Sequence, residues 1–278
     1  VTGAKGAGKT FTQLQMLYRE TWTEYGLAAG IANVTAEAPI VPVLTSRNLG
    51  DEASRRVQSI RDAAADGGTS ATSLEILDVI QEALSEDTSE RQWRQIWAWT
   101  MARSLGIDST VEDSEAALVA SSARSFTAVF VIDGLEDILQ NVVTDSRQQR
   151  ALRVLLQDTL EWLRSIRGRP FGLVVFVRRD LVRAAFQQNG EQFLSRYRAY
   201  ELAWNETEAV RLAAWVSVTS GAAHTPVRDV RELDESDLAD FMVGIWGDKM
   251  GTARSREARS RGWFLAALSD FNGGIQAR

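Results

Sequence analysis

The chain has 278 residues, of which 45% are hydrophobic and 24% are charged, and its net charge at pH 7 is −6. These values are ordinary for a soluble globular protein, and the length allows one large α/β domain with or without a small appendage. The sequence has no cysteine, which excludes disulfides and thiolate metal sites and fits the cytoplasm. No apolar run is long enough to span a membrane, and an acidic chain has no global attraction to nucleic acid.

Both ends of the sequence suggest a piece of a longer protein. The chain begins at Val1 rather than Met, and only Val1 and Thr2 remain of the strand that we expect before the first loop. It ends at Arg278, inside an expected helix.

The first loop carries a phosphate-binding pattern. Residues 3–10 read Gly-Ala-Lys-Gly-Ala-Gly-Lys-Thr and match G-x-x-x-x-G-K-[ST] at every fixed position. Glycines let the backbone curl so that successive N–H groups point inward and surround an anion. Lys9 offers a compact charge to the β- and γ-phosphates, and the Thr10 hydroxyl offers an oxygen to Mg²⁺. The backbone groups that we expect at the phosphates are those of Gly3, Gly6, Ala7 and Gly8.

Apolar residues follow the loop at helical spacing, from Phe11 to Trp22. The positive N-terminal end of such a helix would face the same phosphates. The sequence therefore predicts binding of a nucleoside triphosphate. ATP is favoured over GTP, because the chain contains no Asn-Lys-x-Asp guanine motif.

Further strands are expected at four apolar runs, in residues 40–45, 126–132, 171–177 and 200–204. Pro42 favours an edge position for the first of them. Continuous apolar runs separated by helices are typical of a parallel sheet that is covered on both faces.

Helices are signalled between these runs. Thr72 with Glu75, and Asn205 with Glu208, match the capping-box spacing that starts a helix. A tryptophan-containing stripe at helical spacing is interpreted as core rather than as a ligand site. Its members are Trp93, Ile96, Trp97, Thr100 and Met101.

Acidic residues follow the strand at residues 126–132. Asp133 ends that strand, at the edge where open α/β sheets bind their ligands, and there it can hold Mg²⁺ opposite Thr10. Glu136 and Asp137 follow within one helical turn, and either one can polarise the attacking water or accept its proton.

Two arginines, Arg178 and Arg179, end the next strand. This position would bring a cation close to the γ-phosphate, where negative charge must be stabilised during transfer.

Together, these three segments resemble the Walker A, Walker B and sensor-1 pieces of an AAA+/STAND P-loop ATPase. The string from Asp133 to Asp137 is most similar to NACHT- and KAP-like members. Two departures stand out: Gly134 follows Asp133 where an acid is often found, and the string ends in Glu-Asp rather than Asp-Glu. The catalytic acid therefore stays open between Glu136 and Asp137.

The resemblance implies an α/β fold, namely a P-loop NTPase three-layer sandwich with a mostly parallel five-stranded sheet, followed by a partial helical lid. The nucleotide-binding domain would cover residues 1–204, with a helical insertion at about 47–124. The lid would cover residues 205–278 and be incomplete at its C-terminal end. Residues 272–278 look like the start of a late lid helix, where such families often carry a sensor-2 arginine.

The resemblance also implies a function: the chain would bind and hydrolyse MgATP as the regulatory module of a larger signalling or defence protein. It further implies ATP-dependent self-association. The sequence leaves alternatives open: a nucleotide-binding switch with little turnover, and a P-loop kinase that acts on a small molecule. A nucleic-acid motor is disfavoured by net charge, although arginines in residues 164–169 and 254–261 could bind phosphate locally. The sequence identifies no protein partner.

Overall fold

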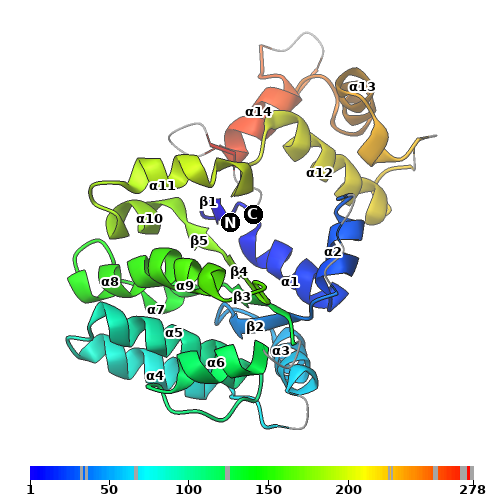
Figure 1. Ribbon diagram of the computed structural model, residues 1–278. Coiled ribbons are helices and arrows are strands. Elements are labelled where there is room, and N and C mark those ends of the chain that lie inside the picture. The colour runs from blue at the N-terminus through cyan, green and yellow to red at the C-terminus, as the bar shows by residue number, and fades with distance from the viewer. Residues whose placement is uncertain are drawn as a thin grey trace. The chain divides into compact units, whose positions relative to one another are not determined.

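The computed structural model describes residues 1–31, 34, 37–65, 68–122, 126–224, 226, 228–252, 256–269 and 274–275. The chain forms two compact units (Figure 1). The first contains Val1–Gly3 and Gly8–Glu201, and the second contains Ala4–Ala7 and Leu202–Arg278.

Within the described residues, the strands form two three-stranded sheets, in the orders β2-β3-β4 and β5-β1-β6. Strand β3 pairs in parallel with β2 and with β4, and β1 pairs in parallel with β5. The strands are β1 (Thr2–Gly3), β2 (Ile40–Leu44), β3 (Ala128–Ile132), β4 (Phe171–Val175), β5 (Val177–Arg178) and β6 (Glu201–Leu202).

The fold is α/β, but the expectation of a single five-stranded sheet is wrong. The segment of residues 171–178, which contains the apolar run expected at 171–177, is divided at Phe176 into β4 and β5. The Phe176 N–H still donates to the Ile132 carbonyl at 2.8 Å, whereas the Val177 N–H donates to the Val1 carbonyl at 3.0 Å. This one run therefore leaves β3 and joins β1, so that it contributes a strand to each sheet.

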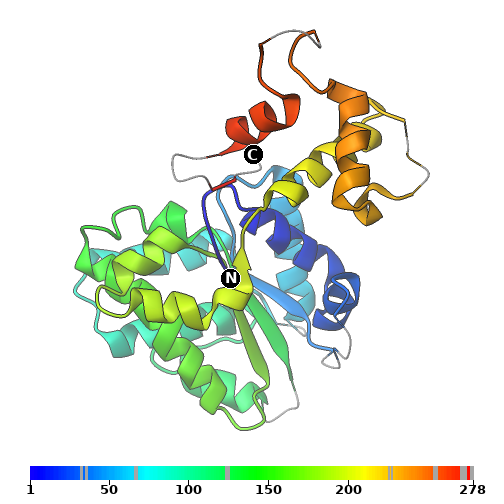
Figure 2. The ribbon, with the colours of Figure 1, turned by 90° about the horizontal axis from the view of Figure 1, so that it is seen from above.

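Helices lie on both sides of the strands in the first unit (Figure 2). Helices α1 and α2 lie on one side, and α8 to α11 lie on the other. The helices of this unit are α1 (Lys9–Arg19), α2 (Trp22–Ala28), α3 (Asp51–Ala64), α4 (Ser73–Ser85), α5 (Glu90–Ser104), α6 (Ser114–Ser122), α7 (Leu135–Ile138), α8 (Ser146–Val154), α9 (Leu160–Ser165), α10 (Arg179–Ala185) and α11 (Gly190–Arg196). A π-helical turn, Leu155–Thr159, joins α8 to α9, and a 3-10 turn, Arg198–Tyr200, follows α11.

Local helix signals agree with the structure where they can be compared. Thr72 and Glu75 form both hydrogen bonds of a capping box at the start of α4. The Asn205 side chain accepts a hydrogen bond from the Glu208 N–H at the start of the first helix of the second unit, Glu206–Thr219. The tryptophan stripe is core, since every member from Trp93 to Met101 is buried in α5.

The helix after the first loop differs from its apolar pattern. Phe11 and Tyr18 are 67% and 53% exposed, whereas Gln13, Met16 and Leu17 are buried. The Gln13 side chain is accommodated because its Nε2 donates to the Leu44 carbonyl at 3.0 Å. The buried face of α1 is therefore set by its contact with β2 rather than by hydrophobicity alone.

The second unit contains α12 (Glu206–Thr219), α13 (Glu235–Trp246), α14 (Ser260–Leu268) and a 3-10 turn (Val230–Glu232). Its small core is formed by Val210, Ala214, Val230, Leu233, Leu238 and Met242. Arg254 and, apart from Gly274 and Ile275, the expected late lid segment lie outside the described residues. In the part of the chain that is described, no helix combines the length and apolar character needed to cross a bilayer.

Strand β2 lies at the edge of its sheet, as Pro42 predicts, and a buried cation covers that edge. Arg61 of α3 is 0% exposed. Its Nε donates to the Pro42 carbonyl and its Nη2 to the Val43 carbonyl, both at 2.8 Å, and its Nη1 donates to Ser73 Oγ at 3.0 Å. The guanidinium thus satisfies carbonyls that an edge strand would otherwise leave unpaired.

We expect Arg61→Met to lower the free energy of unfolding by about 3 kcal/mol, because it leaves these buried carbonyls without a donor. Urea unfolding would measure the change. The control is Arg55→Met on the same helix, which is exposed and should cost no more than about 0.5 kcal/mol. Equal losses in the two variants would contradict a structural role for the Arg61 bonds.

Candidate nucleotide-binding site

Left-handed backbone shapes the loop between β1 and α1. Gly8 is the N-cap of α1 with a φ of 91°, and Gly6 has a φ of 83°. These values favour glycine, because a Cβ is strained there. Since Gly8 has no side chain to cap the helix, the positive end of α1 remains available to an anion. Gly6 and Ala7 belong to the second unit, whereas Gly3 and the residues from Gly8 onward belong to the first.

The hydroxyl of Thr10 meets the acid that ends β3. Thr10 Oγ1 donates to Asp133 Oδ2 at 2.7 Å, which joins residues 123 positions apart in the sequence. Asp133 is 1% exposed, and its other oxygen, Oδ1, is buried without a hydrogen-bond partner among the described residues. Burial raises the pKa of the Asp133 carboxyl, although the Thr10 hydroxyl opposes that rise. One carboxylate oxygen is therefore held in place by Thr10, while the other is buried without a hydrogen bond from a described residue.

Lys9 lies among charged groups. It is 6% exposed, and this burial lowers the pKa of its ammonium group. Glu136 and Asp133 oppose the lowering through their negative charge, whereas Arg178 adds to it. Lys9 is thus within electrostatic reach of Asp133, Glu136 and Arg178.

The two acids of α7 have different environments. Asp137 Oδ2 accepts hydrogen bonds from the Arg47 N–H at 2.8 Å and from Ser46 Oγ at 3.1 Å. Glu136, in contrast, has a buried Oε2 without a hydrogen-bond partner in the described protein. The structure therefore assigns Asp137 to the loop after β2 and leaves Glu136 next to Lys9.

Gly134 is required by the close approach of the same loop. Its φ is 77°, and a Cβ at this position would lie 2.6 Å from Ser46 Cα and 2.7 Å from Ser46 N. Both neighbours are backbone atoms, so neither can move aside easily. The glycine that follows Asp133 is thus explained by packing.

The two neighbouring arginines, Arg178 and Arg179, form ion pairs with different acids. Arg178 forms a two-pronged ion pair with Asp180, with its Nε 3.0 Å from Asp180 Oδ1. Arg179 instead pairs with Glu201 of β6. Of the two, Arg178 is the one that affects Lys9, so Arg179 is tied to the sheet rather than to the site.

Strand order is a second indication of where a ligand would bind. Strands β1 and β5 are neighbours, yet the chain after β1 continues to β2 in the other sheet, whereas the chain after β5 continues to β6 on the far side of β1. In open α/β sheets, ligands bind at the carboxyl ends of two strands whose connections diverge in this way. These ends are Gly3 and Arg178, which are partners in the strand register.

Sequence reasoning missed two residues that shape this site, Ser46 and Asp180. Asp180 follows Arg178 by two positions, a spacing that allows a local ion pair and could have suggested it. Ser46 lies 91 positions from its partner Asp137, and no local signal connects the two.

The residues present fit a magnesium ion that is bound together with a nucleotide. Mg²⁺ is commonly held by one or two protein oxygens, with phosphates and waters completing its shell. Thr10 and the unpartnered oxygen of Asp133 supply such atoms. Among the described residues, no group of three or more histidines or acids forms a separate metal site.

Comparisons with models of protein families, with curated proteins and with solved structures gave no match to this chain.

Gly134→Ala should destabilise the protein by about 3 kcal/mol, from left-handed strain plus the clash with Ser46. The matched control is Gly168→Ala, because Gly168 has a φ of 81° and nothing within 4 Å of an added Cβ. It should lose only about 1 kcal/mol. Thermal and urea unfolding measure both variants, and similar losses would show that the contact with Ser46 is not tight.

Asp133→Asn should stabilise the ligand-free protein at neutral pH by about 1 kcal/mol, because it removes a buried charge with an unpartnered oxygen. The raised pKa means that the folded state holds the Asp133 proton more tightly than the unfolded state. Wild-type stability therefore falls as pH rises from the unfolded pKa through the higher folded pKa, and the variant lacks this loss.

Urea unfolding between about pH 4 and pH 7 would measure this difference. The exposed Asp78→Asn is the control and should show no such gain. A variant that is less stable than wild type at neutral pH would contradict the predicted cost of the Asp133 charge.

Proposed function

We propose that this chain binds MgATP at the loop between β1 and α1 and hydrolyses it, as the regulatory ATPase module of a larger signalling or defence protein. The observation that carries the proposal is the 2.7 Å hydrogen bond from Thr10 to Asp133. A glycine-rich turn that merely caps a helix has no need of a buried acid from a distant strand. A nucleotide-bound Mg²⁺, in contrast, is commonly held by such protein oxygens.

Each residue has a proposed role. Lys9 and the backbone amides of Gly8, Lys9 and Thr10 at the start of α1 bind the phosphates. Thr10 and Asp133 would hold Mg²⁺, which would neutralise charge on the phosphate oxygens. Because the Thr10 hydroxyl donates a hydrogen bond to Asp133, the lone pairs of its oxygen remain available to a cation.

Glu136 is the proposed residue that orients the attacking water and takes its proton. Its Oε2 has no other partner among the described residues, and it lies close enough to Lys9 to affect that pKa. Carboxylates in this role contribute about 10²- to 10⁴-fold to rate. Arg178 would stabilise the charge that develops on the γ-phosphate.

A nucleotide-binding switch with little turnover is the second candidate. It is favoured by the ion pair of Arg178 with Asp180, because this arginine must leave Asp180 before it can reach a phosphate. A module in which that exchange needs a partner would bind ATP and hold it. ATP-dependent self-association and a cytoplasmic location follow from the family resemblance and the use of ATP, and they belong to the same proposal.

Glu136→Gln should bind ATP within about threefold of wild type but hydrolyse it at least about 100-fold more slowly. Asp137→Asn should hydrolyse ATP within about threefold of the wild-type rate. Its free energy of unfolding should instead fall by about 1 kcal/mol, because the variant weakens the hydrogen bonds to Ser46 and Arg47. Titration with a fluorescent ATP analogue and a phosphate-release assay, both with Mg²⁺, measure these effects. The opposite pattern would make Asp137 the water-activating acid.

Lys9→Ala is the test of the phosphate site itself. It should lose ATP binding and hydrolysis, whereas Lys5→Ala, which removes an exposed charge from the same loop, should keep both. Hydrolysis at the wild-type rate by Lys9→Ala would refute the ATPase proposal. Tight MgATP binding by wild type without phosphate release would favour the switch.

A further inference from the structure

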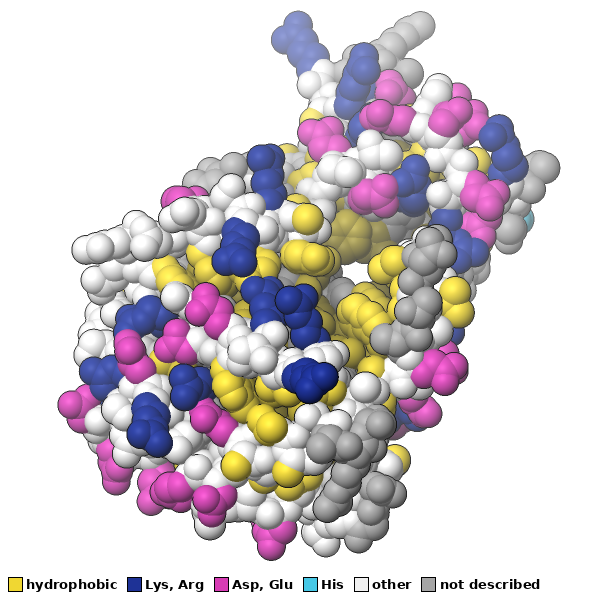
Figure 3. Space-filling model, viewed as in Figure 1, with side chains coloured by type: hydrophobic (Ala, Val, Ile, Leu, Met, Phe, Trp, Pro, Cys, Tyr) yellow, Lys and Arg dark blue, Asp and Glu magenta, His cyan; other side chains and the backbone are white. Residues whose placement is uncertain are grey.

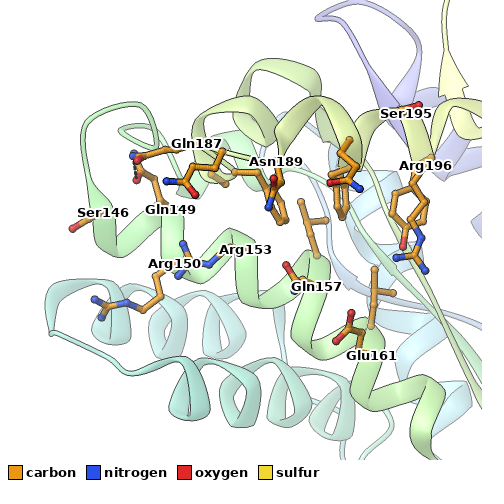
Figure 4. Close-up of a pocket in the computed structure, with 18 of the residues that line it drawn as sticks. Ser146, Gln149, Arg150, Arg153, Gln157, Glu161, Gln187, Asn189, Ser195 and Arg196 are labelled. Atoms are coloured by element: carbon orange, nitrogen blue, oxygen red, sulfur yellow. Dashed lines mark hydrogen bonds between the residues drawn. The ribbon is translucent and has the colours of Figure 1, made fainter.

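A groove of about 1100 Å³ lies on the first unit, away from the residues of the nucleotide site. One wall is formed by α8, the π-helical turn and α9, and the other by residues 185–197 of α10, α11 and their connection (Figure 4). We call it the α8–α11 groove. On this face, basic and hydrophobic side chains lie side by side (Figure 3).

The floor of the groove is apolar. Leu156 and Phe186 are among its lining residues and are 4% and 8% exposed. The rings of Phe186 and Phe193 stack with centroids 4.6 Å apart, and the centroids of the Phe193 and Tyr197 rings are 4.8 Å apart. The aromatic stack of Phe186, Phe193 and Tyr197 therefore forms one apolar side of the groove.

Side-chain amides line the walls above this floor. Gln187 donates to Gln149 at 3.1 Å across the groove. In Figure 4, Gln187 and Asn189 point from one wall toward Gln149 and Gln157 on the other. Gln157, Gln188, Asn189 and Gln192 are exposed, and no side-chain hydrogen bond joins them to other described residues. An amide offers both a donor and an acceptor, which is the combination that an extended polypeptide backbone presents.

The charges of the groove are unevenly compensated. Arg150 pairs with Asp87 at 2.7 Å, and Arg153 pairs with Glu90 at 2.6 Å. Arg164 and Arg196, at the other end, form no ion pair with any described residue, although both lie close to Tyr197.

These two arginines flank the tyrosine. Arg164 lies 3.5 Å from the Tyr197 hydroxyl, and Arg196 lies over its ring at 5.8 Å. Glu161 also lines the groove, but the two cations exceed its charge. This end of the groove therefore attracts a carboxylate.

The π-helical turn is a second feature of the same wall. It widens the helix at Leu155–Thr159, and its Leu156 and Gln157 line the groove. The Thr159 hydroxyl in this turn is buried without a partner in the described protein. Such turns cost regular helix hydrogen bonding and are frequent at functional sites.

We propose that the α8–α11 groove binds an extended, acidic polypeptide segment of a protein partner, with carboxylates at Arg164 and Arg196 and the peptide backbone along the amides. A nucleic acid fits less well. Two of the four arginines are already neutralised, Arg196 covers the Tyr197 ring on which a base would stack, and the net charge of the chain is −6. The proposal does not depend on nucleotide binding.

Two pools of fluorescein-labelled decapeptides would test it by fluorescence anisotropy with the full chain. The pools carry neutral residues at all positions except two adjacent central ones, which are Asp in one pool and Asn in the other. Two charge-assisted contacts at the exposed Arg164 and Arg196 should make the Asp pool bind about fivefold more tightly. The double variant Arg164→Gln/Arg196→Gln should remove this preference.

The matched control is Arg55→Gln/Arg167→Gln, which removes the same charge from exposed positions outside the groove and should keep the preference. Thermal unfolding would verify that both double variants remain folded. Equal binding of the two pools, no binding of either, or an equal loss in the control would overturn the proposal. Tighter binding of a 20-residue oligodeoxythymidine that displaces the Asp pool would overturn it in favour of nucleic acid.

Discussion

The run at residues 171–178 pairs first with β3 and then with β1, and the candidate site depends on this change of partner. Val175 is still in register with Ile132, while Arg178 is in register with Gly3. The carboxyl ends of three strands are thereby brought to one place. Thr10 meets Asp133 across this connection, since the strand before its loop and the strand before Asp133 both pair with the shared run.

Burial sets the electrostatics at that place. It raises the pKa of Asp133 and lowers that of Lys9, so each group is pushed toward its neutral form. A ligand that brings both a divalent cation and a polyanion would reverse both tendencies at once. The ligand-free fold therefore carries a cost at Asp133 and Lys9 that packing elsewhere must offset, which is common where a site is built for a charged ligand.

Much of this arrangement is predictable from local sequence, and the reason is that its signals are local. The glycine and lysine pattern, the apolar strands and the capping box of Thr72 with Glu75 each lie within a few residues. What could not be predicted depends on distant partners. The apolar run is divided at Phe176 because it pairs with β3 before this residue and with β1 after it. Arg179 is held by an ion pair with Glu201, which lies on β6. The exposure of Phe11 likewise follows from which side of α1 contacts β2.

The difference between Glu136 and Asp137 follows from backbone geometry. Successive residues of a helix point about 100° apart, so neighbours in α7 cannot both face Lys9. Gly134 decides which one does, because its missing Cβ lets the backbone at Ser46 approach to a distance that any other residue would block. Ser46 and the Arg47 N–H then hold Asp137. Gly134, which differs from the motif that this segment resembles, therefore gives Asp137 a structural role and leaves Glu136 as the acid beside Lys9.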